Sequence, residues 1–351
     1  MNKLSIQRFF VYILLICLLF IPNVLLACTS FIIQEDNQIL LAKNLDWEID
    51  NGFILVNKKG ILKTAYTNNP QKLTWISKFG SVTFNQFGKE FPLGGMNEKG
   101  LVIEELNSWG EPPDYENKYQ MNEFQWTQYC LDNFANVEEL IKSIDNIVIA
   151  PLFINLHYLI SDSYGNTAIV EFYNGRRYLY NGENLPYPIL TNNHYENSLK
   201  YLSNFKGFDG NMEVRSENTS NERFVKVASM LKIGKTKDTS EEFAFNILDY
   251  VSQKDTQWSI IYNISNKSIQ FKTLQNKTIK TIDLVNIDFS CNTPISFYEV
   301  NNGNDFKELE PVDNEKLLMD VFSKYEYHNL GNVNKKEFLN LIDYGNSIIC
   351  Q

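Results

Sequence analysis

The sequence predicts an α+β protein in which a few helices pack on antiparallel sheets. Three observations favour this class. Short strand-like runs bounded by polar turns recur along the chain, helical patterns are fewer and lie apart from them, and 24 Phe and 19 Tyr among 351 residues can fill a large core. We therefore expect one catalytic domain over residues 28–300. A helical extension of the same domain is predicted over residues 301–351.

The strand predictions begin with a hairpin. Thr29–Ile33 and Gln38–Ala42 are strand-like and flank a polar turn. A second hairpin is predicted from Leu156–Ser161 and Thr167–Phe172, around a turn that contains Gly165. Further strands are predicted, in chain order, at Phe53–Val56, Gly80–Phe84, Leu101–Glu105, Trp258–Asn263, Ser268–Lys272 and Thr278–Leu284.

Helical spacing is clearest at Asn221–Leu231. Phe224, Val227 and Met230 recur there at helical spacing, and Gly234 is placed to end the helix. The other helices predicted are Asn122–Asn133, Val137–Ile144, Glu241–Tyr250 and two short helices within Asn314–Ile342.

The N-terminal segment is typical of a secretory signal peptide, predicted over residues 1–27. Lys3 and Arg8 precede the apolar run Phe9–Ala27, which ends in a small residue suited to cleavage. The mature protein is then secreted or periplasmic and begins at Cys28. Two alternatives stay open. Leu-Leu-Ala-Cys also fits a lipoprotein signal, which would place a lipid on Cys28 and hold the protein on a membrane, and the apolar run approaches the roughly 20 residues of a membrane span.

An N-terminal cysteine combines two reactive groups in one residue. The Cys28 thiol has an ordinary pKa of about 8.5, and a free α-amine has one of about 7.7–8.0. Either group can be tuned to work near neutral pH. A nucleophile that carries its own base is the arrangement of N-terminal nucleophile hydrolases.

Charge and cysteine spacing exclude several functions. A net charge of −10 without a basic block argues against nucleic acid or an anionic membrane as the main partner. The cysteines show no metal-binding spacing, so we predict neither metal nor cofactor. Cys17 would leave with the leader, and Cys130 is expected to be a buried free thiol. Cys291 and Cys350 can pair in an oxidising compartment, but spacing does not decide whether they do.

The polar residues near these elements also have ordinary structural interpretations. Asp46 can belong to a turn after the strand that ends near Ala42. Arg223 at a helix start is more often a solvated charge, and Asn107 and Asn192 can be loop residues. His157 lies in an apolar run and is expected to be a core histidine.

Several short motifs nevertheless match one family in order and spacing. The sequence resembles the choloylglycine hydrolase family, which includes bile salt hydrolases and penicillin V acylases. The resemblance is good to about residue 231 and weak beyond Cys291. The motifs that carry it are Cys28-Thr29-Ser30-Phe31, Lys43-Asn44-Leu45-Asp46-Trp47, Gly95-Met96-Asn97-Glu98-Lys99-Gly100-Leu101, Leu106-Asn107, Leu156-His157-Tyr158, Ile160-Ser161-Asp162, Ile189-Leu190-Thr191-Asn192 and Glu222-Arg223-Phe224.

The resemblance implies a four-layer αββα fold, with two antiparallel sheets between helical layers, and hydrolysis of a linear, non-peptide amide. It places the nucleophile at Cys28 and the aspartate that holds the α-amine at Asp46. It implies oxyanion donors from the Asn192 side chain and the Asn107 backbone N–H. The family's second arginine falls on Arg223.

The family's first arginine falls on Lys43, where the sequence departs from the pattern. Arginine offers a planar fork of donors and lysine a compact charge, so the exchange changes the directed hydrogen bonds. Lys43 can still lower the pKa of a nearby thiol. We expect a working site of altered geometry. Asn107 resembles the bile salt hydrolase pattern more than the penicillin V acylase pattern.

The substrate is expected to be a small N-acyl amide such as a conjugated bile acid, penicillin V or an acyl homoserine lactone. Three aromatic segments, Trp75–Phe84, Trp109–Tyr119 and Phe153–Tyr158, can line an acyl pocket or belong to the core. A dipeptidase-like hydrolase and a lipid-anchored, non-catalytic binding protein of the same fold are the alternatives. The resemblance also makes a homo-oligomer plausible.

Overall fold

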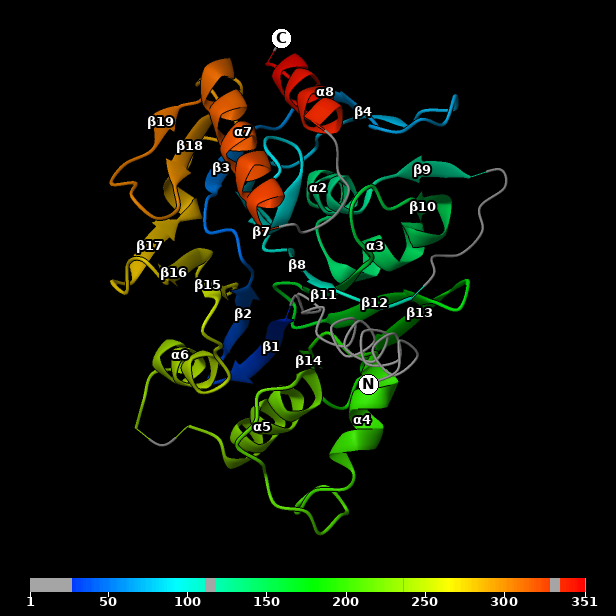
Figure 1. Ribbon diagram of the computed structural model, residues 1–351, viewed down its shortest axis with the longest axis vertical. Helices are drawn as coiled ribbons and strands as arrows, with labels where there is room; N and C mark the ends of the chain where they lie inside the picture. Colours follow the sequence, from blue (N-terminus) through cyan, green and yellow to red (C-terminus); the bar gives the residue numbers. More distant parts are fainter. Residues whose placement is uncertain (1–26, 111–117, 236, 329–334, 351) are drawn as a thin grey trace, which may run out of the picture.

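The computed structural model describes residues 27–110, 118–235, 237–328 and 335–350, and the predicted leader before Ala27 lies outside them (Figure 1). Two antiparallel sheets form the centre of the structure. The first sheet has six strands, which in spatial order are β14 (Ile189–Leu190), β1 (Ala27–Glu35), β2 (Gln38–Asp46), β15 (Thr256–Asn263), β16 (Ser268–Thr273) and β17 (Lys280–Asp283).

The second sheet has nine strands. In spatial order they are β13 (Arg176–Asn181), β12 (Thr167–Tyr173), β11 (Leu156–Ser161), β8 (Val102–Asn107), β7 (Pro92–Asn97), β6 (Ser81–Asn85), β3 (Phe53–Asn57), β18 (Ser296–Glu299) and β19 (Lys307–Glu308). Two small sheets lie beside it, formed by the antiparallel pair β4 (Leu62–Thr64) and β5 (Thr74–Ile76) and by the parallel pair β9 (Tyr119–Met121) and β10 (Ile147–Ile149).

The helices of the described chain are α2 (Glu123–Asn133), α3 (Val137–Ser143), α4 (Tyr195–Leu202), α5 (Ser220–Ile233), α6 (Ser240–Tyr250), α7 (Pro311–Tyr327) and α8 (Lys335–Ser347). Short 3₁₀ turns occur at Ile144–Asn146, Gly182–Asn184 and Leu284–Asn286. No helix of the described ranges combines the length and the apolar character needed to cross a membrane.

The layers follow the order helix, sheet, sheet, helix. α5 and α6 pack on the first sheet, while α2 packs on β7 and β8 of the second. Figure 1 shows these helical groups at opposite ends of the view, with the sheets between them. Aromatic rings fill the space between the sheets, where Phe84 contacts Trp258, Tyr262 and Phe271. The predicted αββα fold is confirmed.

Local sequence signals explain where the main helices begin and end. The Asn122 side chain accepts from the Gln125 N–H and starts α2. Thr239 and Glu242 form a capping box at the start of α6. Gly234 ends α5 with a φ of 76°, a left-handed value that glycine adopts without a steric penalty.

The predicted hairpins and helices are confirmed to within a few residues, but ten of the described helices and strands were missed. They are β7, β13, α4 and the short strands β4, β5, β9, β10, β14, β18 and β19. β7 contains Gly94 and Gly95, which read as a turn in the sequence. In the structure a Cβ on Gly94 would lie 2.4 Å from the Glu104 carboxyl carbon. The glycine is therefore needed because the Glu104 side chain lies against the Gly94 backbone.

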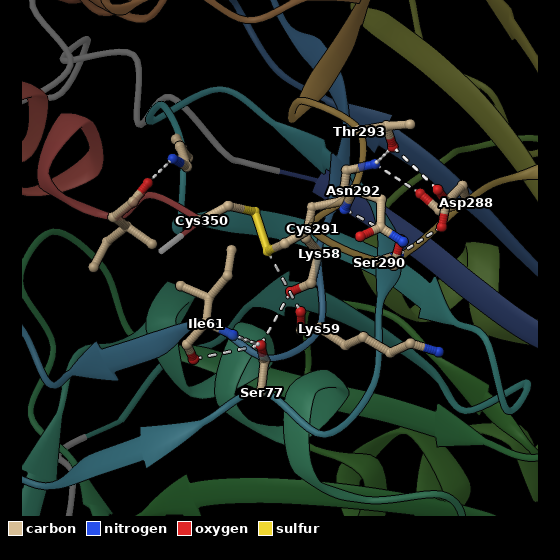
Figure 2. The surroundings of a disulfide bond; sticks show 12 residues. Lys58, Lys59, Ile61, Ser77, Asp288, Ser290, Cys291, Asn292, Thr293 and Cys350 are labelled. Carbon is tan, nitrogen blue, oxygen red and sulfur yellow. Dashed lines mark hydrogen bonds between the residues drawn. A yellow bond between two sulfur atoms is a disulfide. The ribbon is translucent and has the colours of Figure 1, made fainter.

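A disulfide fastens the C-terminal end to the body of the protein. Cys291 and Cys350 are bonded, with their Cα atoms 5.5 Å apart. Figure 2 shows this bond beside Lys59, whose backbone oxygen lies 3.7 Å from the Cys291 sulfur. The pairing that sequence spacing left open is therefore present, and α8 ends close to the bridge.

Candidate active site

Cys28 lies near the start of β1, in the first sheet. It pairs with Leu45 of β2 and is 3% exposed. Ala27 precedes it in the chain, so the Cys28 nitrogen is a peptide N–H, and it donates to Asn192 Oδ1 at 2.9 Å. The residue predicted to be the nucleophile is thus buried in direct contact with a predicted oxyanion donor.

Arg223 on α5 holds Cys28 and Asn192 together. Its Nη2 donates to Asn192 Oδ1 at 2.7 Å and to the Cys28 carbonyl at 3.1 Å. Its Nε donates to Thr29 Oγ1 at 2.9 Å, and Nη1 donates to the Asn218 carbonyl at 2.8 Å. The side chain is 1% exposed, so the interpretation of Arg223 as a solvated surface charge is wrong. Its planar guanidinium reaches four acceptors on three different segments.

Asp46 ends β2 instead of forming a turn, because β2 continues four residues beyond the predicted end at Ala42. Its two carboxylate oxygens accept from Thr256 Oγ1 at 2.5 Å and Gln253 Nε2 at 3.2 Å. Burial raises the Asp46 pKa to about 6, against the lowering effect of the positive charge of Arg223. Asp46 also lies opposite Ala27 in the β1–β2 pair, next to the bond that cleavage would break.

Lys43 lines the same cavity as Cys28 and contacts two glutamates. Its Nζ is 2.7 Å from Glu104 Oε2 and donates to the Glu105 backbone oxygen at 2.5 Å. Glu104 also accepts from the Tyr262 hydroxyl. All of these side chains are buried. Lys43 is therefore held by an acidic partner. Burial lowers the pKa of Lys43, but the negative charge of Glu104 raises it, and the net effect of its surroundings is a raised pKa.

Asn107 ends β8 and joins the site through its backbone. Its carbonyl accepts from Asn192 Nδ2 at 3.0 Å. The neighbouring Ser108 N–H donates to the Asn155 carbonyl at 2.9 Å, on the β11 side of β8. Since successive N–H groups of a strand point to opposite edges, the Asn107 N–H points away from β11. The Asn107–Asn192 contact joins the two sheets at the position of Cys28.

With residue 27 attached, the Cys28 thiol is protonated near neutral pH. Burial raises its pKa to about 11, and the nearby charge of Lys43 is the largest influence that lowers it. Asp46 acts in both directions, because its negative charge raises this pKa and its backbone hydrogen bond lowers it. Attack by this sulfur therefore needs a group that accepts its proton.

A narrow cavity of about 60 Å³ opens beside Cys28. It shares five lining residues with a wider hollow of about 460 Å³: Trp47, Asn107, Phe153, Ile154 and Tyr325. The remaining lining of the narrow cavity is mostly apolar and consists of Lys43, Leu45, Gln86, Phe87, Leu93, Glu105, Phe124 and Leu156.

The three aromatic segments considered for the acyl pocket have different positions. Phe153, Ile154 and Leu156 line the narrow cavity. Trp109 borders the wider hollow, while residues 111–117 of that segment lie outside the described chain. Trp75 and Phe84 do not line either space: Trp75 donates to Asp132, and Phe84 packs between the sheets.

His157 and Cys130 have the structural positions predicted for them. His157 is fully buried, and its Nδ1 lies 2.8 Å from Glu171 Oε1. Cys130 is a buried free thiol on α2. No group of three metal-ligating side chains is found in the described ranges.

Sequence reasoning missed Glu104, Thr256 and Tyr325. Nothing in the local pattern separates Thr256 and Tyr325 from ordinary strand and helix positions. Thr256 reaches Asp46 from a strand more than 200 residues away, and Tyr325 reaches the cavity from α7. Only the Glu104-Glu105 pair inside an apolar strand was a signal, because adjacent acids in a buried strand need partners.

Comparison with known proteins gives a consistent result. Residues 28–297 match the model of the family described as linear amide C–N hydrolases, choloylglycine hydrolase family. The chain is 26% identical over 317 residues to penicillin V acylase from Pectobacterium atrosepticum, covering 76% of this chain and 83% of that protein. It is 28% identical over 159 residues to bile salt hydrolase/transferase from Clostridium perfringens, covering 41% of this chain and 47% of that protein.

Solved structures show the same fold. Penicillin V acylase from Agrobacterium tumefaciens superposes with a TM-score of 0.70 at 24% identity, over 81% of this chain and 98% of that one. An arginine-to-leucine variant of conjugated bile acid hydrolase from Clostridium perfringens gives 0.65 at 20% identity, over 81% of this chain and 100% of that one. With the family match spanning most of the sequence, the chain belongs to the choloylglycine hydrolase family of linear amide C–N hydrolases.

Proposed function

We propose that the mature protein begins at Cys28 and hydrolyses a small N-acyl amide through a thioester on that residue. The observation that carries the proposal is the convergence on Cys28 of Asn192, Arg223 and the end of β8 at Asn107. These groups come from distant parts of the sequence, and they meet beside the cavity that Cys28 borders.

The first step is transfer of the Cys28 thiol proton to its own α-amine, directly or through water. The high pKa of the buried thiol makes this base necessary. Cleavage after Ala27 would create the amine one residue from the position that Asp46 faces in the β1–β2 register. Asp46, itself oriented by Thr256 and Gln253, is the group proposed to hold the amine.

The thiolate sulfur then bonds to the amide carbonyl carbon, and the carbonyl oxygen becomes an oxyanion. The Asn107 backbone N–H and the Asn192 side-chain amide are the proposed donors to it. Such prepositioned donors are each worth on the order of 10²–10³ in rate in other enzymes. Arg223 fixes the Asn192 side chain by binding its Oδ1, which leaves Nδ2 as the amide's donor end.

Collapse of the tetrahedral intermediate breaks the C–N bond. The ammonium group of Cys28 returns the proton to the departing amine, and an acyl thioester remains. Water, deprotonated by the α-amine, attacks the thioester and releases the carboxylic acid and the thiol. Lys43 lies near the sulfur throughout and lowers the thiol pKa, so its charge favours the thiolate.

The proposed substrates have an apolar acyl group, because the narrow cavity is mostly apolar. The named activities of the relatives make penicillin V and conjugated bile acids the first compounds to test. The protein is proposed to be secreted or periplasmic. The sequence Leu25-Leu26-Ala27-Cys28 supports a second candidate, a lipid-anchored binding protein in which an acylated sulfur cannot attack.

The test measures amine release from a panel of N-acyl amides by the mature protein and two variants. We expect hydrolysis by wild type, residual hydrolysis by Cys28→Ser and none above background by Cys28→Ala. Folding is checked for each by circular dichroism. Cys28→Ala activity close to that of wild type would rule out the mechanism. Release of free amino acids from dipeptides instead of acyl amides would favour a peptidase.

A further inference from the structure

The C-terminal helices α7 and α8 lie beyond the part of the chain that matches the family. That match ends at residue 297, whereas α7 begins at Pro311 and α8 ends at Ser347. Figure 1 shows both helices at the end of the molecule that also holds α2. Their contacts with the cavity beside Cys28 are therefore contributed by a segment outside the matched domain.

Tyr325 is the α7 residue that reaches the cavity. It is 7% exposed and borders both the narrow cavity and the wider hollow. Its ring centroid lies 6.5 Å from that of Trp47, the residue after Asp46. Tyr325 therefore lies where the two spaces meet, opposite Trp47, which directly follows the end of β2.

Phe338 on α8 packs directly behind this wall. It is fully buried, with ring centroids 5.0 Å from Phe322 and 6.2 Å from Tyr325 of α7. It also contacts Phe153 at 5.9 Å and Phe87 at 6.5 Å, and both of those rings line the narrow cavity. The packing of α8 is thus coupled to the position of rings that the substrate would touch.

Three links fix the two helices to the body of the protein. The Cys291–Cys350 disulfide holds the end of the chain (Figure 2). The Tyr344 hydroxyl donates to the Thr64 carbonyl at 2.7 Å, and Asn314 Oδ1 accepts from the Lys89 N–H at 2.9 Å. With both ends fixed, the aromatic rings have little freedom to move apart.

We propose that α7 and α8 form a specificity wall, in which Tyr325 limits the width of the acyl group that reaches Cys28. The inference rests on the proposed amide hydrolysis and adds its substrate class: slender acyl groups, either a straight chain or a single planar ring. Tyr325 and Trp47 lie in ring contact where the two spaces meet, so fused-ring acyl groups, the steroid of a conjugated bile acid among them, are disfavoured relative to slender ones.

The test compares Tyr325→Ala with Tyr327→Ala. Tyr327 lies on the same helix but is 85% exposed, so it is a matched control for loss of a tyrosine. The substrates are amides of one amine with a hexanoyl, a phenylacetyl or a fused-ring naphthoyl group. Tyr325→Ala should raise the kcat/KM ratio of naphthoyl to hexanoyl amide by at least about tenfold, the scale of a pocket-size change. Tyr327→Ala should leave the ratio at the wild-type value.

A chemical readout separates this proposal from the proposed activity. Iodoacetamide and a bulky N-aryl maleimide are reacted with the mature proteins, and modification of Cys28 is followed by peptide mass spectrometry. Tyr325→Ala should raise the maleimide rate relative to iodoacetamide, whether or not any amide is hydrolysed. Tyr325→Leu, which keeps an apolar side chain, should shift the ratio in the same direction and covers the case in which the alanine variant does not fold.

The possible results have distinct meanings. Equal reagent ratios for wild type and both folded Tyr325 variants would overturn the specificity wall, and so would equal shifts in the Tyr325 and Tyr327 variants. A selective shift in reagent ratio without hydrolysis of any amide would support the wall and count against the proposed function. Selective shifts in both assays would support both.

Discussion

Lys43 Nζ lies 2.7 Å from Glu104 Oε2, and both side chains are only 2% exposed. The lysine stands where the family resemblance places an arginine, and it is paired with a carboxylate from the other sheet. Glu104 in turn lies against Gly94 and accepts from Tyr262. The charge beside the nucleophile is therefore balanced within the core, and the departure from the family pattern has a structural partner.

Removing one member of this ion pair should strongly destabilise the folded protein. Lys43→Met leaves Glu104 as an uncompensated buried charge, which typically costs about 3–5 kcal/mol. Lys43→Met with Glu104→Gln removes both charges and should recover most of that loss. Urea unfolding of the single and double variants measures the difference. A single variant as stable as wild type would show that the pair does not hold both groups charged.

The activity should fall in acid, because the α-amine that serves as base and the Asp46 carboxylate that holds it are both protonated there. With residue 27 attached, burial raises the Asp46 pKa from 3.8 to about 6. The free energy of unfolding depends on pH in the opposite direction. Because the Asp46 pKa is raised in the folded state, Asp46 favours folding at low pH, and this stabilisation is lost as the pH rises from about 4 to 6. A kcat/KM profile checks the first point. Asp46→Asn should lower activity and shift this acidic limb, which the α-amine alone then sets.

Loss of the Asn192 side chain should reduce kcat by roughly 10²–10³, the effect of removing one oxyanion donor. Asn193→Ala is the matched control, because Asn193 binds Asn221 and Ser220 instead of Cys28. The control should retain kcat within about threefold, a change of well under 1.4 kcal/mol. Equal losses in the two variants would indicate a general disturbance of the β14–α4 connection.

Glu123 on α2 positions one wall of the cavity. Its carboxylate accepts from the backbone N–H groups of Leu152, Phe153 and Ile154 at 2.7–3.1 Å. Glu123→Gln brings an N–H₂ group toward these donors, so we expect about 1–3 kcal/mol of destabilisation and a higher KM. Urea unfolding and substrate titration measure both effects. Glu138→Gln on the exposed face of α3 is the control, and a KM equal to wild type in both variants would contradict this role.

The disulfide should contribute substantially to stability. Cys291 and Cys350 are 59 residues apart, and closing a loop of that size limits the unfolded chain by about 4 kcal/mol in the chain-entropy estimate. The double variant Cys291→Ser with Cys350→Ser should therefore unfold at a lower urea concentration. A loss of unfolding free energy below about 1 kcal/mol would show that the bond restricts the unfolded chain only slightly.

Local sequence was enough to predict most of the central strands and helices. The hairpin of β1 and β2 was predicted because apolar runs flank a short polar turn, and α5 because helical spacing ends in glycine. β7 was missed because its glycines serve close contacts with other strands, Gly94 with Glu104 and Gly95 with Val82 and Thr83. A tertiary requirement of this kind leaves no local periodicity.

The candidate site was predictable only through the family motifs. Local pattern gave Asp46 as a turn residue and Arg223 as a surface charge, and both are buried. Their environment is created by segments far away in the chain, as when Arg223 reaches Cys28 across 195 positions. Tyr325 and Glu104 were missed because the motifs do not include them; packing alone brings Tyr325 to the cavity and Glu104 to Lys43.

The most direct test of the central claim is the mass of the Cys28 peptide after the mature protein, made through its native secretory route, is mixed with an N-acyl amide and acid-quenched. We predict a chain that begins at Cys28 and carries the substrate's acyl group on that residue during turnover. An N-terminus upstream of Cys28, a diacylglyceryl group on its sulfur, or turnover without an acyl adduct on Cys28 would contradict the account.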